Sequence, residues 1–205
     1  MNFLAHLHIA AHTKTSFTGN FLGDFVKGRP EGRYNDNIVK GIRLHRFVDS
    51  YTDHHPLIKP LKPLFPQPLR RYSPIALDMF WDHCLSLHWH HFDSSSLADF
   101  CRRAELQIAE ECRVEVNSLP PRFEHVSQLV FKNRWFEHYA DLDNTMIGLE
   151  KMSMRSARLA PLAMTGEVLK KHYDVLLEQF FVLYPDVLQK THEHSAILKI
   201  KKEAK

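Results

Sequence analysis

The sequence has few cysteines and none of the common glycine patterns of nucleotide-binding proteins. Cys84, Cys101 and Cys112 have no C-x-x-C spacing and leave an odd thiol, which is typical of a reducing compartment and not of a disulfide framework. The seven glycines form neither a Rossmann nor a P-loop pattern. Glu-x-x-His, which a ferritin-like oxidase needs twice, does not occur. These absences exclude several enzyme classes, and we expect a cytoplasmic protein.

Long apolar runs and a strong charge are also missing. The N-terminal segment MNFLAHLHIAAH lacks a basic start and carries three histidines, so it is typical of neither a signal peptide nor a membrane span. The net charge of +3 is small for a nucleic-acid-binding surface. We therefore expect no membrane and no nucleic-acid partner. The charge is uneven, since residues 1–75 hold 11 Lys and Arg against 5 Asp and Glu. Either an acidic partner docks there or the segregation is chance.

Apolar residues recur at spacings of three and four along most of the chain, and no sustained alternation of period two is present. This pattern predicts an all-α fold. Five prolines between Pro56 and Pro68 predict a loop inside the domain. We expect one helical domain over 1–190 and a polar, fraying tail over 191–205. The predicted helices cover 2–12, 17–27, 36–54, 74–91, 96–116, 124–139, 142–158 and 167–183.

The helix predicted over 36–54 presents a row of possible metal ligands. His45, Asp49 and Asp53 follow one another at intervals of four residues, on the side opposite Leu44 and Val48. The chain has 15 histidines, and neutral imidazole is the commonest protein ligand for transition metals. The alternative is an ordinary solvated face with a local His–Asp pair.

The helix predicted over 74–91 carries two carboxylates on an almost wholly apolar sequence. Asp78 and Asp82 lie one turn apart, so burial would force them to repel each other and to lose hydration. A metal ion would satisfy both carboxylates. Alternatively, each accepts hydrogen bonds from a helix terminus or pairs with an arginine.

Two further candidates lie near the N-terminus. Asp24 follows Gly23 in an apolar stretch, where a glycine lets another backbone or a ligand approach. His6 belongs to the first predicted helix, although a lone histidine there is more often an ordinary core or surface residue. Imidazole and carboxylate ligands together suit manganese, magnesium or iron better than a structural zinc site.

Five segments carry a resemblance to a known family. In order and spacing, MNFLAHLHIA, GNFLGDFVKG, GIRLHRFVDSYTDHHP, SPIALDMFWDHCLS and MSMRSARLAPL resemble the acyl carrier protein phosphodiesterases, also called holo acyl carrier protein hydrolases. The resemblance implies a distorted HD-domain-like metal phosphohydrolase that prefers Mn²⁺, with Mg²⁺, Fe²⁺ or Co²⁺ as substitutes. It also implies cleavage of the phosphodiester between a serine of acyl carrier protein and 4′-phosphopantetheine. Carrier proteins present an acidic helix, which would meet the basic N-terminal half.

The resemblance and the residue rows together give a set of site predictions. The metal ligands are predicted as Asp24, His45, Asp49 and Asp82. The catalytic residues are predicted as His83, Asp78 and His6, with His83 or His6 protonating the serine oxygen. The substrate-binding residues are predicted as Arg155, Arg46 and Arg43, with Arg158 close by. The chain has no His-Asp dipeptide, so the ligand set of ordinary HD proteins does not transfer directly.

Two other functions fit the same residues. One is a metal-dependent phosphohydrolase acting on nucleotides or other small phosphate esters. The other is a non-catalytic module that binds a carrier protein or a metal. Turnover of a free nucleotide would favour the first, and stoichiometric binding without turnover would favour the second.

Overall fold

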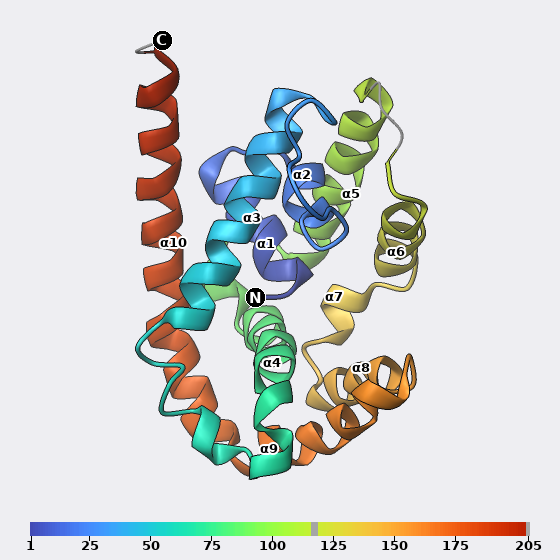
Figure 1. The fold of residues 1–205 in the computed structure, drawn as a ribbon, viewed down its shortest axis with the longest axis vertical. Helices are drawn as coiled ribbons and strands as arrows, with labels where there is room; N and C mark the ends of the chain where they lie inside the picture. Colours follow the sequence, from blue (N-terminus) through green and yellow to red (C-terminus); the bar gives the residue numbers. More distant parts are fainter. Residues whose placement is uncertain (116–118, 204–205) are drawn as a thin grey trace.

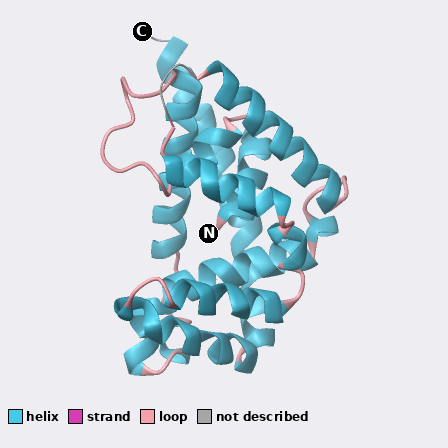
Figure 2. Cartoon of the chain, turned by 90° about the vertical axis from the view of Figure 1, so that its right-hand side faces the viewer, coloured by secondary structure: helices cyan, strands magenta, loops and turns pink. Residues whose placement is uncertain are grey.

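The computed structural model describes residues 1–115 and 119–203, and this part of the chain contains helices and loops but no strand (Figure 2). The all-α prediction is confirmed, while the relationship to HD proteins stays a prediction. No helix in the described ranges is both long and apolar enough to cross a bilayer. The α-helices are α1 Phe3–Thr13, α2 Phe17–Leu22, α3 Asp36–His54, α4 Ser73–Leu87, α5 Leu97–Val114, α6 Pro121–Lys132, α7 Trp135–His138, α8 Leu142–Ser153, α9 Thr165–Lys171 and α10 Tyr173–Glu203. The 3₁₀ helices are η1 Lys62–Leu64, η2 Gln67–Tyr72, η3 Trp89–His91 and η4 Ala157–Met164.

Helix α1 lies in the interior and contacts α2, α3, α4 and α10 (Figure 1). Its sequence from Leu4 to Ala10 is buried on every face, including the two histidines in that stretch. A helix that is enclosed on all sides needs no polar face, so apolar residues are found all round α1 and not on one side only. Any polar group on α1 must therefore find a partner inside the protein.

Two glycines let α2 and α3 pack with their backbones in contact. A Cβ atom on Gly19 would lie 2.4 Å from the carbonyl oxygen of Ile38, and one on Gly41 would lie 2.8 Å from the Cα of Gly19. Both distances are shorter than any van der Waals contact, so larger residues would push the helices apart. This close approach sets the distance between the loop after α2 and the middle of α3.

Several predicted helices end earlier than the apolar pattern indicated. The helix predicted over 36–54 matches α3, but the one over 17–27 ends at Leu22. The segment 124–139 divides into α6 and α7 because Arg134 adopts a φ of 50°, which ends a right-handed helix. The segments 74–91 and 142–158 each finish in a 3₁₀ turn. Residue 116, at the end of the helix predicted over 96–116, lies outside the described residues.

The C-terminal segment is helical beyond the expected domain boundary. Helix α10 continues through Pro185 to Glu203, so the boundary set at residue 190 falls within a helix. Thr191 is fully buried and its hydroxyl donates to the carbonyl oxygen of Leu188. Thr191 thus packs inside the fold, and the fraying of the tail beyond it stays a prediction. Residues 204–205 of the predicted tail lie outside the described part of the chain.

Candidate metal centre

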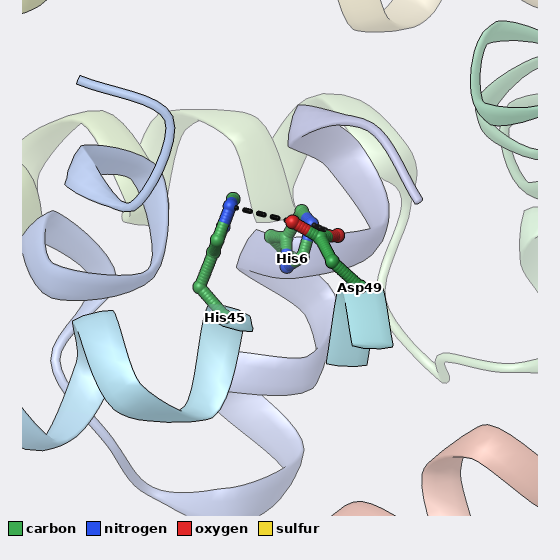
Figure 3. A group of neighbouring side chains, drawn as sticks. All are labelled: His6, His45 and Asp49. Carbon is green, nitrogen blue, oxygen red and sulfur yellow. Dashed lines mark hydrogen bonds and ion pairs between the residues drawn. The ribbon is translucent and has the colours of Figure 1, made fainter. Parts of the chain in front are cut away.

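His6, His45 and Asp49 come together where α1 packs against α3 (Figure 3). One side-chain ligand atom from each residue lies within 4.8 Å of the other two. The two imidazole rings stack with centroids 3.8 Å apart, and both histidines are buried. The structure describes one such group of three possible ligands in residues 1–115 and 119–203.

The ring of His45 is oriented by the backbone of α2. Its Nδ1 lies 2.8 Å from the carbonyl oxygen of Asn20, which can only accept, so Nδ1 carries the proton in the neutral ring. Nε2 then faces Asp49 at 3.0 Å and Asp24 at 3.6 Å. Burial opposes protonation of His45, but hydrogen bonds to Asp24 and Asp49 raise its pKa to about 9. The two carboxylates thus favour a cation at Nε2.

His6 is a neutral imidazole with an unused ring nitrogen. Its Nε2 lies 3.0 Å from Oδ1 of Asp49 and 3.1 Å from the carbonyl oxygen of Met1. Its Nδ1 is buried and has no hydrogen-bond partner among the described residues. Burial, together with the neighbouring His45, lowers the pKa of His6 to about 4. The neutral form, which is the form that binds metals, therefore prevails at neutral pH.

Asp49 and Asp24 supply carboxylates from two different elements. Burial opposes ionisation of Asp49, yet the neighbouring His6 and His45 hold its pKa well below the usual range. Asp24 follows α2 and has a half-exposed side chain. Gly23 makes room for this arrangement, because a Cβ atom there would lie 2.2 Å from the ring of His45.

The donor set of this group fits a divalent cation. Two imidazoles and two carboxylates are ligands that manganese, iron and zinc accept, and the absence of thiolates from the group does not favour a structural zinc site. A backbone carbonyl that fixes the second nitrogen of a histidine, as Asn20 does for His45, is the usual arrangement around metal-binding histidines. His6, predicted as a catalytic residue, lies among the possible ligands.

Asp82, a predicted ligand, lies apart from this group. Its two oxygens accept hydrogen bonds from the backbone N–H groups of Leu4 at 2.8 Å and Ala5 at 3.0 Å. Asn2 precedes α1 without a side-chain cap, so Asp82 caps α1 from another helix. Burial raises the pKa of Asp82 to about 7, while the two N–H donors act in the opposite direction. This is the helix-terminus arrangement that the sequence left open as the alternative.

Asp78 lies at the edge of the candidate centre. Its Oδ1 is 2.6 Å from the amino group of Met1, which is also 3.7 Å from Asp49. Burial raises the pKa of Asp78, and the nearby amino group opposes that rise. Asp78 lines the same cavity as Asp24 and Asp49, so the structure leaves it within reach of a substrate.

His83, the other predicted proton donor, is held in a separate polar contact. Its Nδ1 donates to the carbonyl oxygen of Tyr139 at 2.7 Å, and its Nε2 accepts from the hydroxyl of Tyr173 at 3.0 Å. Burial lowers its pKa. Both nitrogens are therefore used inside the fold.

The three predicted substrate-binding arginines are divided between two surroundings. Arg43 pairs with Glu31, and Arg46 donates to the carbonyl oxygen of Val26 at 2.7 Å. Arg155 instead lines the cavity next to the candidate centre. Arg158 accepts a hydrogen bond from Tyr72 through its carbonyl oxygen.

A cavity of about 880 Å³ begins at the carboxylates of the candidate centre. Apolar side chains from α1, α4, α6, α7 and α8 form much of its wall. Its charged lining consists of Asp24, Asp49, Asp78, Arg122, Lys132, Arg134, Lys151 and Arg155. Four of these cations, Arg122, Lys132, Arg134 and Lys151, were missed from the sequence, because none of them lies in the five segments that carry the family resemblance. The cavity is large enough for an extended substrate.

These features define an all-helical protein whose histidine–carboxylate centre suits a divalent cation and opens into a large cavity. The family model described as acyl carrier protein phosphodiesterase matches residues 1–187. The chain belongs to this family.

Curated relatives cover nearly the whole chain. It is 39% identical over 194 residues to the acyl carrier protein phosphodiesterase of Serratia proteamaculans, which covers 94% of this chain and 98% of that protein. It is 39% identical over 198 residues to the protein of that name from Yersinia pestis, covering 96% and 100%. It is 40% identical over 190 residues to that from Pectobacterium atrosepticum, covering 92% and 96%. No solved structure matches the chain significantly.

Proposed function

We propose that the chain hydrolyses the phosphodiester that joins 4′-phosphopantetheine to the serine of holo acyl carrier protein. The products are apo acyl carrier protein and 4′-phosphopantetheine. The observation that carries the proposal is the group formed by His6, His45 and Asp49 at one end of a large cavity, in a chain of this family.

We further propose that the reaction depends on a divalent metal ion, with Mn²⁺ preferred. His6, His45, Asp49 and Asp24 would hold the ion. Once bound, the ion would lower the pKa of a water molecule and neutralise charge on the phosphate. The protein supplies the neutral imidazole of His6, ionised carboxylates and a backbone contact that fixes the ring of His45, which would give up its Nε2 proton to the ion. Arg155, which lines the cavity, would orient the phosphate.

The test is to incubate the protein with holo acyl carrier protein and Mn²⁺ and to analyse the mixture by mass spectrometry. We expect the carrier protein to lose the mass of its prosthetic arm and 4′-phosphopantetheine to appear. Chelator should stop the reaction, and Asp49→Asn should lower the rate at least about a hundredfold through loss of a charged ligand. Arg43→Ala, on an exposed pair away from the cavity, serves as the matched control and should keep the wild-type rate.

Each other outcome identifies a different function. Cleavage that continues after exhaustive chelation would refute metal dependence. Turnover of free nucleotides with an intact carrier protein would indicate a nucleotide phosphohydrolase. Tight binding of carrier protein or metal without any product would indicate a non-catalytic module.

A further inference from the structure

The cavity that begins at the carboxylates of the candidate centre also has a cationic wall. Five cationic side chains line it, and they come from α6, from the residue before α7, from α8 and from the turn after α8. They are Arg122, Lys132, Arg134, Lys151 and Arg155. No lysine or arginine of residues 1–75 is part of this lining, although that half of the chain holds the excess of basic residues.

Four of these five cations are in no ion pair within the described residues. Arg134 pairs with Glu137 at 3.1 Å. Within the described ranges, no ion pair is found for Arg122, Lys132, Lys151 or Arg155, and all four are exposed. Arg122 lies over the ring of Phe25, 5.9 Å from its centroid, a contact that leaves its charge without a counter-charge. Exposed charges without a carboxylate partner remain available for an interaction across an interface.

One face of α8 joins the positive charge to exposed apolar side chains. Ile147 and Lys151 lie one turn apart on α8, Arg155 comes two residues after this helix ends, and all three line the cavity. Ile147 is 44% exposed, and Met154, next to Arg155 in sequence but outside the cavity lining, is 75% exposed. Exposed apolar side chains close to cations offer a protein partner contacts that a small anion would not use.

The number of cations indicates whether this wall binds only the substrate's phosphate or also the protein that carries it. A phosphodiester carries about one negative charge, and the pantetheine arm carries none, so one arginine or a metal ion satisfies the substrate's own charge. With Arg155 assigned to the phosphate and Arg134 paired with Glu137, three further cations exceed that need. Their natural counterparts are carboxylates on the protein that carries the phosphodiester.

We propose that Arg122, Lys132 and Lys151 form the surface that docks an acidic face of the carrier protein, with Arg155 left for the phosphate. This proposal rests on the proposed function, and it places docking on residues 122–151 instead of on the N-terminal half. The docked protein would present its modified serine toward the carboxylate end of the cavity.

The test uses the metal-loaded full chain and two forms of acyl carrier protein. Binding of fluorescently labelled apo carrier protein, which has no arm to hydrolyse, measures docking without turnover. Steady-state cleavage of the holo form gives KM and kcat. The test variant carries Lys132→Glu with Lys151→Glu, and the control carries Lys170→Glu with Lys171→Glu, two exposed lysines of α9 outside the cavity lining.

We expect the test variant to weaken the Kd for apo carrier protein and to raise KM by about tenfold or more, with a smaller change in kcat. The control should stay within about twofold of the wild type in both assays. Raising the salt concentration from 0.1 M to 1 M shortens the Debye length from about 10 Å to about 3 Å, so it should weaken wild-type binding more than binding by the test variant.

Equal Kd values for the wild type and the test variant would overturn the docking surface, as would an equal loss in the control. The proposed function fails in a different way. In that case the wild type leaves holo carrier protein uncleaved, while the binding assay still reports whether the cationic wall is used. Thermal melting of each variant confirms that the compared proteins are folded.

Discussion

Replacing Asp82 by asparagine separates a structural role from a metal-binding role. Its two oxygens accept from the N–H groups of Leu4 and Ala5, 2.8 and 3.0 Å away. Asparagine keeps the shape of the side chain but turns one oxygen into an NH₂ group, which faces an N–H and leaves that donor without an acceptor. A buried donor without a partner costs about 1–3 kcal/mol. For a domain of this size each kcal/mol lowers Tm by about 2–4 °C, so we expect a fall of about 2–12 °C.

The assay is thermal unfolding with chelator and with Mn²⁺. Asp82→Asn should melt below the wild type in both conditions, because the lost hydrogen bond does not involve a metal. Both proteins should gain the same stability from the ion, about 2.7 kcal/mol at a free concentration one hundred times Kd. The control Asp49→Asn should lose most of this gain. A variant Asp82→Asn that melts like the wild type in chelator but gains nothing from Mn²⁺ would refute the capping role and would make Asp82 a ligand.

Three other substitutions test separate parts of the site. Gly23→Ala places a methyl group 2.2 Å from the ring of His45, so it should weaken Mn²⁺ binding by about 10–100-fold in calorimetric titration. The control Gly166→Ala, whose methyl group meets only the flexible side chain of Met146, should leave Mn²⁺ binding unchanged. Gly41→Ala forces α2 and α3 apart and should cost about 1–3 kcal/mol or more in chemical unfolding; an unchanged midpoint would contradict the close packing. His83→Gln should lower Tm, because both ring nitrogens of His83 are hydrogen-bonded inside the fold, and kcat should stay within about tenfold. A rate loss of about 10²–10⁴ would instead assign His83 as a general acid.

The residues of the candidate centre were predictable to different degrees. His45 and Asp49 were found because four-residue spacing on one helix is visible in the sequence. His6 was named for another role, since no spacing connects residue 6 with residue 45. Their meeting depends on how α1 packs against α3, which is a tertiary contact.

The carboxylates of α4 show a different limit of sequence analysis. Burial of Asp82 was predicted correctly, and so was its need for a partner. The partners are N–H groups 77 and 78 residues away in the chain, and any backbone amide looks the same in a sequence. Arg155 was named from the sequence, but Arg122, Lys132, Arg134 and Lys151 were missed for a related reason, because an exposed cation gives no local signal of the surface that it will face.

The two ends of the cavity come from separate stretches of the chain. The candidate ligands lie within residues 6–49, on α1, on α3 and just after α2, and Gly19 and Gly41 hold α2 against α3; the cationic wall lies within residues 122–155. If the cationic wall docks the carrier protein as proposed, exposed substitutions on α6 and α8 would change which protein is admitted and would leave the candidate ligands in place. A lineage could then follow the divergence of its carrier protein without rebuilding its chemistry.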